Sequence, residues 1–390
     1  MEHPGAESAS GGPEPDQRGK QTVSLRSAQT RDLDFLEQLE ASVFEADRIS
    51  RRSFRHFIAV DTADLVIAEI AGSAVGYSLV LFRHGTALSR LYSIAVDPRA
   101  AGKGVAATLM AAAEMRAYRH GCIAMRLEVR EDNAGAIRLY ERRNFRRIGR
   151  YLDYYQDHAD ALRYEKLLDS GKSPGRSDQP PYFEQTLDFT CAPVCMMMAL
   201  KWAGQDIPFD LPTELKLWRE STTVYMTSGH GGCEPYGIAV ALARRGLAVE
   251  IHASRRPPYF LESVRGREKR LVMKAVQSTF QSEAAELGIP VHHSRLSPSE
   301  MRAALDSGAV VMLLVSGYRM FAKKVPHWLL LIGHDRTHAF VHDPWVEDKH
   351  FETRAAAANL PIPFGELDRM ARYGRKKLQA AVIIRRKRRP

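Results

Sequence analysis

RLYSIAVDPRAAGKGVAATLMAAAEMRAYRHGCIAMRLEVREDNAGAIRLY, residues 90–140, is the stretch that decides the fold of the front part of this chain. An apolar strand, LYSIAV, leads through a turn into a glycine loop at residues 99–104, and a helix is predicted from about Val105 to Arg119. The N–H groups at a helix N-terminus attract anions. Glycines at positions 102 and 104 let a phosphate approach the backbone closely. The stretch therefore predicts an anion cradle between a strand and a helix.

Length and charge bound the possibilities. The chain has 390 residues, which at roughly 100–200 residues per domain predicts two or three domains. Its net charge is +10, and a basic surface suits an anionic cofactor, acidic peptides or nucleic acid. About half of this excess lies in the run 385–389, which we interpret as a solvated end. Interleaved basic and aromatic residues are missing from the sequence, so no nucleic-acid partner is predicted.

Cysteine usage and hydropathy indicate the compartment. Four cysteines are too few for a disulfide scaffold and match no zinc spacing, so a reducing, cytoplasmic setting fits best. Residues 1–21 lack an apolar segment typical of a secretory signal and are predicted to be disordered. There is no run of about 18 apolar residues, so no membrane span is expected. The oligomeric state is not predicted by any feature of the sequence.

The front part of the chain alternates strands and helices. Before the opening stretch we expect a strand at 23–26, helices from Thr30 and at 51–58, and strands at 65–71 and 74–83. Closing strands are predicted at 145–155 and 161–168. The pattern indicates a mixed α/β domain at residues 22–168.

A polar segment rich in Gly, Ser and Pro, residues 169–180, is the predicted linker to a second domain at 181–390. In that domain helices come first and strands later, which indicates an α+β domain. The predicted helices are 191–201, 214–219, 237–245, 271–287 and 298–306, and the predicted strands are 248–251, 309–316, 327–333, 339–342 and 379–385.

The front domain resembles the GNAT acetyltransferases, in particular the RimI-like N-terminal acetyltransferases, over residues 22–168. The motifs that carry the resemblance are IAVDP, RxxGxG and LEVRxxNxxAIxLYxxxxF. The resemblance implies an α/β GNAT fold with acetyl-CoA as the cofactor and a peptide or protein amine as the acceptor. The pyrophosphate would lie on Arg99, Gly102, Lys103 and Gly104, and the pantetheine arm along the backbone of Ile94 to Val96.

The same resemblance implies roles for three more residues. Asn133 would contact the cofactor, Tyr140 would protonate the departing thiolate, and Glu128 would be the general base for the amine. The chemistry is consistent, because an α-amine with a pKa of ~8 must lose a proton before it attacks a thioester. Positioning the amine beside the thioester should supply most of the acceleration.

Structural alternatives to these roles remain open. Glu128 could be a strand carboxylate paired with Arg126 or Arg130, and Tyr140 could be a core aromatic. Arg99 and Lys103 could be solvated loop charges. Ala100 and Ala101 also stand where many members of the family carry another basic residue, which leaves Lys103 as the second cation of the loop.

A second constellation lies downstream. Gln185 precedes Cys191 by six residues, and Cys191 begins an apolar helix. A helix N-terminus favours the thiolate form of a cysteine, and a glutamine N–H can complete an oxyanion hole with the backbone N–H of the nucleophile. His327 begins an apolar strand and Asp343 ends the next one, so two adjacent antiparallel strands would let the imidazole bridge the thiol and the carboxylate.

At these residues the chain resembles the peptidase C39-like group of papain-like cysteine peptidases. The matching pieces, over residues 181–385, are Q-x5-C-A-P-x-C, the strand that begins HW, and HDP. The resemblance implies a papain-like domain in which Gln185 is the oxyanion donor, Cys191 the nucleophile, His327 the base and Asp343 the residue that orients it. Ala192 departs from the glycine that is more common in the family.

Other cysteines and histidines have plainer interpretations. In isolation Cys191 would be interpreted as a buried structural thiol, Cys195 one turn later as a core residue, and Cys233 as a loop thiol. His334, His338 and His342 are four residues apart, a spacing that suggests a metal site on a helix. Strand signals and a turn between them argue against a helix, so solvated loop histidines are favoured and no metal is predicted.

Three hypotheses follow. In the first, the chain is bifunctional, with an N-acetyltransferase joined to a cysteine peptidase; cleavage would create a new α-amine that acetylation caps. In the second, the cysteine domain transfers an acyl group to an amine, because an acyl-thioester can be attacked by an amine as well as by water. In the third, the cysteine domain binds peptides without catalysis.

Overall fold

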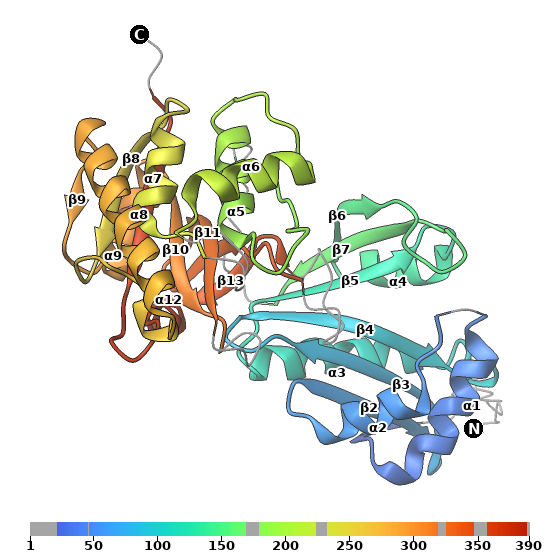
Figure 1. Cartoon of the computed structure of the whole chain (residues 1–390). Coiled ribbons are helices and arrows are strands. Elements are labelled where there is room, and N and C mark those ends of the chain that lie inside the picture. The colour runs from blue at the N-terminus through green and yellow to red at the C-terminus, as the bar shows by residue number, and fades with distance from the viewer. Residues whose placement is uncertain are drawn as a thin grey trace, which may run out of the picture.

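The computed structural model describes residues 22–45, 47–168, 179–223, 232–318, 325–346 and 357–387. The predicted disordered tail, residues 1–21, and residues 169–178 of the predicted linker lie outside them. The described chain forms two seven-stranded sheets, one in the N-terminal half (22–168) and one in the C-terminal half (179–387), which lie side by side (Figure 1). No helix among the described residues is long and apolar enough to cross a membrane.

The sheet of the N-terminal half has the strand order β1-β2-β3-β4-β5-β7-β6. Its pairings are antiparallel except that of β4 with β5, which is parallel. The strands are β1 (Val23–Ser27), β2 (Ala63–Ile70), β3 (Ser73–Phe82), β4 (Leu88–Val96), β5 (Ala124–Arg130), β6 (Arg146–Tyr151) and β7 (Ala161–Leu167). The helices are η1 (Thr30–Asp32), α1 (Leu33–Val43), α2 (Arg51–Ala59), η2 (Pro98–Ala100), α3 (Val105–Arg119) and α4 (Ala134–Arg142).

Successive side chains of a strand point to opposite faces of the sheet, and on the inner strand β2 both sets are buried. On β2, Leu65 and Ile67 pack with the apolar residues of α1 and α2. Val66 and Ala68, one position along, pack with Val105 and its neighbours at the start of α3. Helices therefore cover the sheet on both sides, and the loop before α3 is held close to the sheet.

The β4 and β5 strands stay paired over only a short length. Their register runs from Leu88 opposite Ala124 to Arg90 opposite Arg126. Beyond this point β4 continues along β3 to Val96, whereas β5 continues along β7, and the two strands diverge (Figure 1). The parallel pair thus opens into a wedge whose β4 edge carries Ile94 to Val96.

Two expectations for the N-terminal half need correction. The predicted closing strand 145–155 is shorter, since β6 ends at Tyr151 and residues 152–160 form a loop in which the Asp153 N–H donates to the Asp160 carboxylate. The helix expected from Thr30 starts as the 3-10 turn η1, capped by reciprocal hydrogen bonds between Gln29 and Asp32. In both places side chains satisfy backbone groups that a regular element would have paired.

The sheet of the C-terminal half has the order β13-β12-β11-β10-β14-β8-β9. The strands are β8 (Ala248–Ala253), β9 (Val291–His292), β10 (Val310–Ser316), β11 (Pro326–His334), β12 (His338–His342), β13 (Leu360–Pro363) and β14 (Ala380–Arg385). The helices are α5 (Cys191–Trp202), α6 (Leu211–Ser221), α7 (Pro235–Ala243), η3 (Leu261–Ser263), α8 (Arg267–Glu286), α9 (Pro298–Asp306) and α12 (Phe364–Met370). The sequence did not predict β9, β13 and α12, which are short.

This second sheet is also covered on both faces. On β10, Met312 and Leu314 pack with α5 and α7, whereas Leu313 and Val315 pack with α9 and α12. Strands buried on both faces read as continuous apolar runs rather than as alternating ones. The apolar run VVMLLV therefore predicted a strand, but it did not predict which of its side chains point to which face of the sheet.

The two halves meet where β4 and β5 begin. The Ala87 N–H donates to the Pro361 carbonyl (2.7 Å), and the Arg126 guanidinium donates to the carbonyls of Ala358 (2.6 Å) and Asn359 (3.0 Å). Apolar residues of both halves share one cluster, which includes Leu88, Ala124, Leu360, Ile362 and Phe364. We call this set of contacts the junction.

Candidate active sites

The glycine loop ends at the N-terminus of α3. Gly102 and Gly104 have φ angles of 76° and 79°, a region that side chains disfavour. A Cβ atom at either position would meet nothing within 4 Å, so both glycines face open space. No side chain among the described residues caps α3. The first N–H groups of α3 therefore have no side-chain cap at the N-cap residue, which is compatible with the predicted anion cradle.

The two cations of this loop are exposed. The Arg99 side chain is 91% exposed and forms an ion pair with Asp97, 2.6 Å away. Lys103 is also exposed. Ala100 is only 3% exposed and packs in the cluster beneath α3. The alanine at this position is therefore explained by packing, and a basic side chain there would be forced into the core.

The predicted cofactor contacts from the strand and from Asn133 lie on opposite sides of the wedge. The backbone of Ile94 to Val96 pairs with β3 on one edge, and its other edge faces the wedge. The Asn133 side chain caps α4 by accepting from the Ala136 N–H (3.0 Å), a structural role that the sequence did not indicate. Its amide nitrogen is not used by that cap.

Glu128 lies on β5 with only 4% of its side chain exposed. Its Oε2 accepts from the Arg90 Nε at 2.7 Å, and its Oε1 is buried with no hydrogen-bond partner among the described residues. The structural alternative expected Arg126 or Arg130 as the partner, and this was wrong: they pair with acidic residues elsewhere. One carboxylate oxygen is thus fixed while the other is unused.

Tyrosines surround this carboxylate. The Arg90 guanidinium also donates to the Tyr154 hydroxyl (2.9 Å), and Tyr154 packs edge-on against Tyr155. Burial raises the pKa of Tyr155, and its neighbours Tyr154 and Glu128 raise it further. The sequence assigned the stretch 152–155 to a strand and gave no signal that it lines this site.

Tyr140 lies on α4 and is 5% exposed. Its ring contacts Phe145, with the centroids 5.9 Å apart. Burial raises the pKa of Tyr140, so the phenol keeps its proton at neutral pH. A protonated phenol is the form that an acid needs, and the packing also matches the alternative of a core aromatic.

The second constellation assembles as the sequence predicted. Cys191 is the first residue of α5, His327 is the second residue of β11, and Asp343 follows β12 directly. The His327 Nε2 lies 2.7 Å from the Asp343 Oδ1. Cys191 lies close enough to His327 to contribute to the rise of the His327 pKa, and Nδ1 is the ring nitrogen that Asp343 leaves unused. The exposed fractions are 8% for Cys191, 2% for His327 and 0% for Asp343.

The protonation of this pair follows from its partners. Burial lowers the pKa of His327, but the charge and hydrogen bond of Asp343, together with Cys191, raise it to about 10. For the carboxyl of Asp343 the signs are opposite. Burial raises its pKa, but the neighbouring charges of His327 and Arg83 bring the pKa below its ordinary value. The imidazolium and the carboxylate are thus favoured together, which is the charge state that supports a neighbouring thiolate.

Asp343 has a partner that the sequence did not reveal. The Nη2 of Arg83, which follows β3 in the N-terminal half, donates to the Asp343 Oδ2 at 2.6 Å. The Trp345 N–H donates to the Oδ1 (2.9 Å), and the Tyr182 hydroxyl donates to the Asp343 carbonyl (3.1 Å). The carboxylate is therefore held on both oxygens.

Gln185 lies in the loop before α5. Its Nε2 donates to the Leu187 carbonyl (2.8 Å), which leaves one amide hydrogen for an oxyanion, and its Oε1 is buried without a partner among the described residues. Glu214 of α6 holds this loop, accepting from the Thr186 N–H (3.0 Å) and from the Thr190 hydroxyl. Glu214 is fully buried, and the sequence identified only the helix on which it lies.

The remaining cysteines belong to the core. Cys195 is fully buried, as predicted, and its Sγ lies 3.5 Å from the Trp328 carbonyl. Cys233 lies outside the named helices and strands, as expected of a loop thiol, but it is 3% exposed and its sulfur accepts from the Ser221 hydroxyl. All four cysteines are free.

The three spaced histidines do not form a cluster. His334 and His338 contact Asp306 and Asp335, respectively, at strand ends. His342 is buried rather than solvated, which corrects the prediction; its ring contacts the Pro180 carbonyl and the Asn359 N–H. Burial lowers the pKa of His342 to about 4, so its ring is neutral.

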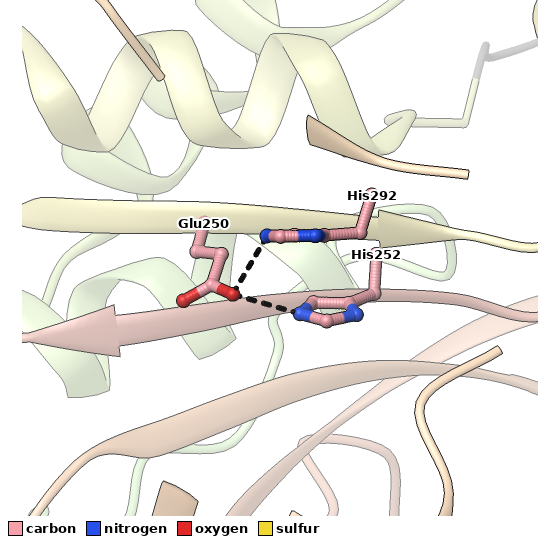
Figure 2. A group of neighbouring side chains, drawn as sticks. All are labelled: Glu250, His252 and His292. Atoms are coloured by element: carbon pink, nitrogen blue, oxygen red, sulfur yellow. Dashed lines mark hydrogen bonds and ion pairs between the residues drawn. The ribbon is translucent and has the colours of Figure 1, made fainter. Parts of the chain in front are cut away.

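Among the described residues, one group could offer three ligand atoms to a metal: Glu250, His252 and His292, whose ligand atoms lie within 4.8 Å of one another. Both histidines contact the same carboxylate oxygen, at 3.0 and 2.9 Å (Figure 2). The two rings are stacked, 19° from parallel and 4.5 Å apart. A metal ion lies in the plane of each imidazole that binds it, so these rings cannot share one ion as they stand. We interpret the group as a clamp between β8 and β9.

Comparisons with known proteins identify a family for each half of the chain. The model of the Peptidase_C39 like family matches residues 180–385, and that of the acetyltransferase (GNAT) family matches residues 30–145. An uncharacterized N-acetyltransferase of Methanocaldococcus jannaschii is 28% identical over 151 residues, which cover 38% of this chain and 95% of the relative. Both resemblances expected from the sequence are confirmed.

Solved structures of acetyltransferases are similar in fold to the N-terminal half of the chain. The ribosomal-protein-S18-alanine N-acetyltransferase from Escherichia coli is 22% identical, covers 40% of this chain and 99% of its own, and has a TM-score of 0.36. Ard1 from Thermoplasma volcanium is 23% identical, covers 37% of this chain and 97% of its own, and has a TM-score of 0.34.

Proposed function

The chain belongs to the Peptidase_C39 like family and carries a GNAT acetyltransferase domain ahead of the family's own domain, and we propose that it is a bifunctional enzyme acting on peptides or proteins. The N-terminal half transfers an acetyl group from acetyl-CoA to an amine. The C-terminal half cleaves an amide bond through Cys191. We place the boundary between the domains in residues 169–180.

Acetyl-CoA fits the features of the N-terminal half. The exposed N–H groups at α3 and the glycines at 102 and 104 suit the pyrophosphate. The open edge of β4 in the wedge suits the amide groups of the pantetheine arm, which can hydrogen-bond like an added strand. Arg99 and Lys103 are then outer cations rather than buried ligands, consistent with their exposure.

In this proposal Glu128 and Tyr140 handle the protons. The free Oε1 of Glu128 accepts a proton from the acceptor amine, directly or through a water, while Arg90 fixes the Oε2. The Tyr140 phenol gives its proton to the departing thiolate of CoA. The tyrosines 154 and 155 close the site on the side of the acceptor, where they would contact a peptide backbone or side chain.

In the C-terminal half, His327 takes the thiol proton of Cys191, and the thiolate attacks the carbonyl carbon of the substrate. The backbone N–H of Cys191 and the second amide hydrogen of Gln185 stabilise the oxyanion. His327 then returns the proton to the leaving amine, and water hydrolyses the thioester. The new α-amine is of the kind that the N-terminal half would acetylate.

The observation that carries the cysteine half is the buried 2.7 Å contact between His327 and Asp343, with Cys191 near enough to the same ring to raise its pKa. The three residues come from α5, from β11 and from the position directly after β12, and the first and last are 152 positions apart in the sequence (343 minus 191). Cys191, the proposed nucleophile, is the most exposed of them. A structural cysteine would not require a histidine and a carboxylate in this order.

A peptide library tests both activities. The full-length protein is incubated with defined peptides, with and without acetyl-CoA, and the products are identified by mass spectrometry. We expect cleaved peptides in both samples and acetylated amines only with acetyl-CoA. Cys191→Ser should remove cleavage but leave acetylation, and Tyr140→Phe should do the reverse while CoA binding persists.

Two results would contradict the proposal. Acetylation at the wild-type rate in Tyr140→Phe would refute the role of Tyr140. The absence of cleavage in every sample, together with an acyl product that appears only when a second amine is added, would make the cysteine half an amide-forming transferase.

The four free cysteines are typical of a reducing compartment, so we propose a cytoplasmic enzyme.

A further inference from the structure

The carboxylate that orients His327 is shared with the N-terminal half. The Oδ1 of Asp343 contacts the His327 ring and its Oδ2 accepts from Arg83, which stands 260 residues away in sequence. The side chains of Arg83 and Asp343 are 6% and 0% exposed. The contact is therefore a buried ion pair across the junction, and water does not screen it as it would a surface pair.

The backbone around Arg83 is fixed from both halves. The N–H and hydroxyl of Thr86 both donate to the Arg83 carbonyl, which closes a turn between β3 and β4. The next residue, Ala87, donates to the Pro361 carbonyl in the other half. Gly85, with a φ of 74°, lies against Met370 of α12. The turn therefore holds Arg83 at one position relative to Asp343.

Among the residues that the structure describes, the cations that act on Asp343 are His327 and Arg83. An imidazolium–thiolate pair is neutral, and Asp343 adds one negative charge that is fully buried. Arg83 cancels that charge, so the Asp–Arg pair presents a neutral acceptor to the imidazole. Papain-like proteases obtain the same neutral acceptor from an asparagine. Without Arg83 the buried centre would carry a net charge of −1 whenever Cys191 is ionised, which disfavours the thiolate.

We infer that Arg83 is a positioning residue of the cysteine centre, so that the acetyltransferase domain completes the active site of the peptidase-like domain. The inference rests on the proposed role of Cys191, His327 and Asp343. It makes the junction a functional interface: the cysteine centre is competent when the two domains are docked through Arg83.

Other titratable groups face the same centre. Tyr182 and Cys195 lie close to Asp343, and Cys233 interacts with Cys191; burial raises the pKa of all three, so they are neutral near pH 7. Burial raises the pKa of Glu234, beside Cys233, to about 8, so this carboxyl can also titrate between pH 5 and 9. Glu184 and Tyr151 act on Tyr182 electrostatically and so reach Asp343 only through that neighbour. The charge that balances Asp343 among these groups is that of Arg83.

The test is the pH dependence of Cys191 alkylation in the full-length protein. Iodoacetamide is added between pH 5 and 9, and the peptide containing Cys191 is quantified by mass spectrometry. We expect Arg83→Gln to raise the pH midpoint of alkylation by about one unit, which makes the reaction about tenfold slower at pH values below both midpoints. Adding Asp343→Asn removes the uncompensated charge, so the double variant should return toward the wild-type midpoint.

Two arginine variants serve as controls. Arg83→Lys keeps the positive charge and should retain the midpoint, which also provides a readout if Arg83→Gln does not fold. Arg126→Gln removes hydrogen bonds across the same junction but leaves Arg83 in place, and it should also keep the wild-type midpoint. An equal shift in Arg126→Gln would attribute the effect to docking in general and would overturn the role of Arg83.

The remaining outcomes are equally decisive. A wild-type pH profile in Arg83→Gln, or no recovery in the double variant, overturns the inference. His327→Ala separates it from the proposed function: if that variant alkylates like the wild type, the triad itself is wrong. If His327→Ala abolishes neutral alkylation and Arg83→Gln does not affect it, only the inference about Arg83 fails.

Discussion

Replacing Glu214 by alanine should damage the cysteine site without touching any residue of the triad. The carboxylate accepts from the Thr186 N–H at 3.0 Å and from the Thr190 hydroxyl, and it is fully buried. A buried donor left without its acceptor costs about 1–3 kcal/mol. Thr190 can still donate to the Leu187 carbonyl, so Thr186 carries most of the loss.

From these contacts we expect Glu214→Ala to lose about 2–4 kcal/mol of unfolding free energy. For a domain of this size about 2–4 °C of Tm accompanies each kcal/mol, so the transition of the C-terminal half should fall by roughly 5–15 °C. The loosened loop carries Gln185 and leads into Cys191, and misplacing these groups should slow alkylation of Cys191 about tenfold or more.

Scanning calorimetry gives the first quantity, and iodoacetamide labelling at pH 7 gives the second. Glu220→Ala is the matched control, because Glu220 lies on the same helix but pairs with Arg245 at the surface, with 33% of its side chain exposed. Its loss should stay within about 0.5 kcal/mol. Equal Tm values and equal labelling rates for the two variants would refute the reasoning.

Three further predictions concern backbone space and pH. Because Gly104 has a left-handed φ, Gly104→Ala should lower the free energy of unfolding by about 1–2 kcal/mol, and it should weaken CoA binding in calorimetric titration. Gly121 is also left-handed with open space around its Cβ position, and Gly121→Ala should leave the CoA affinity unchanged. Gly237→Ala should lower the Tm by overpacking, about 1–3 kcal/mol, because its Cβ would lie 2.6 Å from the Ser221 carbonyl; an unaltered Tm would argue against the close packing. The pKa of His327 is about 10 in the folded protein and about 6.5 in the unfolded chain. The protonated ring therefore adds its full stabilisation to the folded state below pH 6.5, and this stabilisation is lost as the pH rises toward about 10. The Tm gap between wild type and His327→Gln should therefore narrow from pH 6 to pH 10, and a constant gap would contradict the assignment.

Sequence patterns predicted the features that depend on neighbouring residues. The loop before α3 and the capped start of α9 at Ser297 follow from short stretches whose hydrogen bonds are local. The positions of Cys191, His327 and Asp343 were predicted from motifs that a known family shares, and the structure brings these side chains together.

Contacts between distant segments were not predictable. Arg90 and Arg83 follow or belong to apolar strands, and nothing in their surroundings indicates that one reaches Glu128 and the other Asp343. Such pairs depend on the order of strands in a sheet and on how two sheets meet, which composition and periodicity do not encode. Asn133 shows a structural role that the sequence did not indicate, since its side chain caps α4; its predicted contact with the cofactor stays a prediction.

The place of β14 in the second sheet has a consequence during synthesis. Residues 380–385 insert between β10 and β8, in the interior of the sheet, although they are the last strand of the described chain. The strand that carries His327 pairs with β10, which stays open on its other edge until β14 has left the ribosome. The acetyltransferase domain can fold while translation continues, because domains generally fold as units from the N-terminus. The pairings of β10 and β8 with β14 can therefore form only after residues 380–385 have been translated.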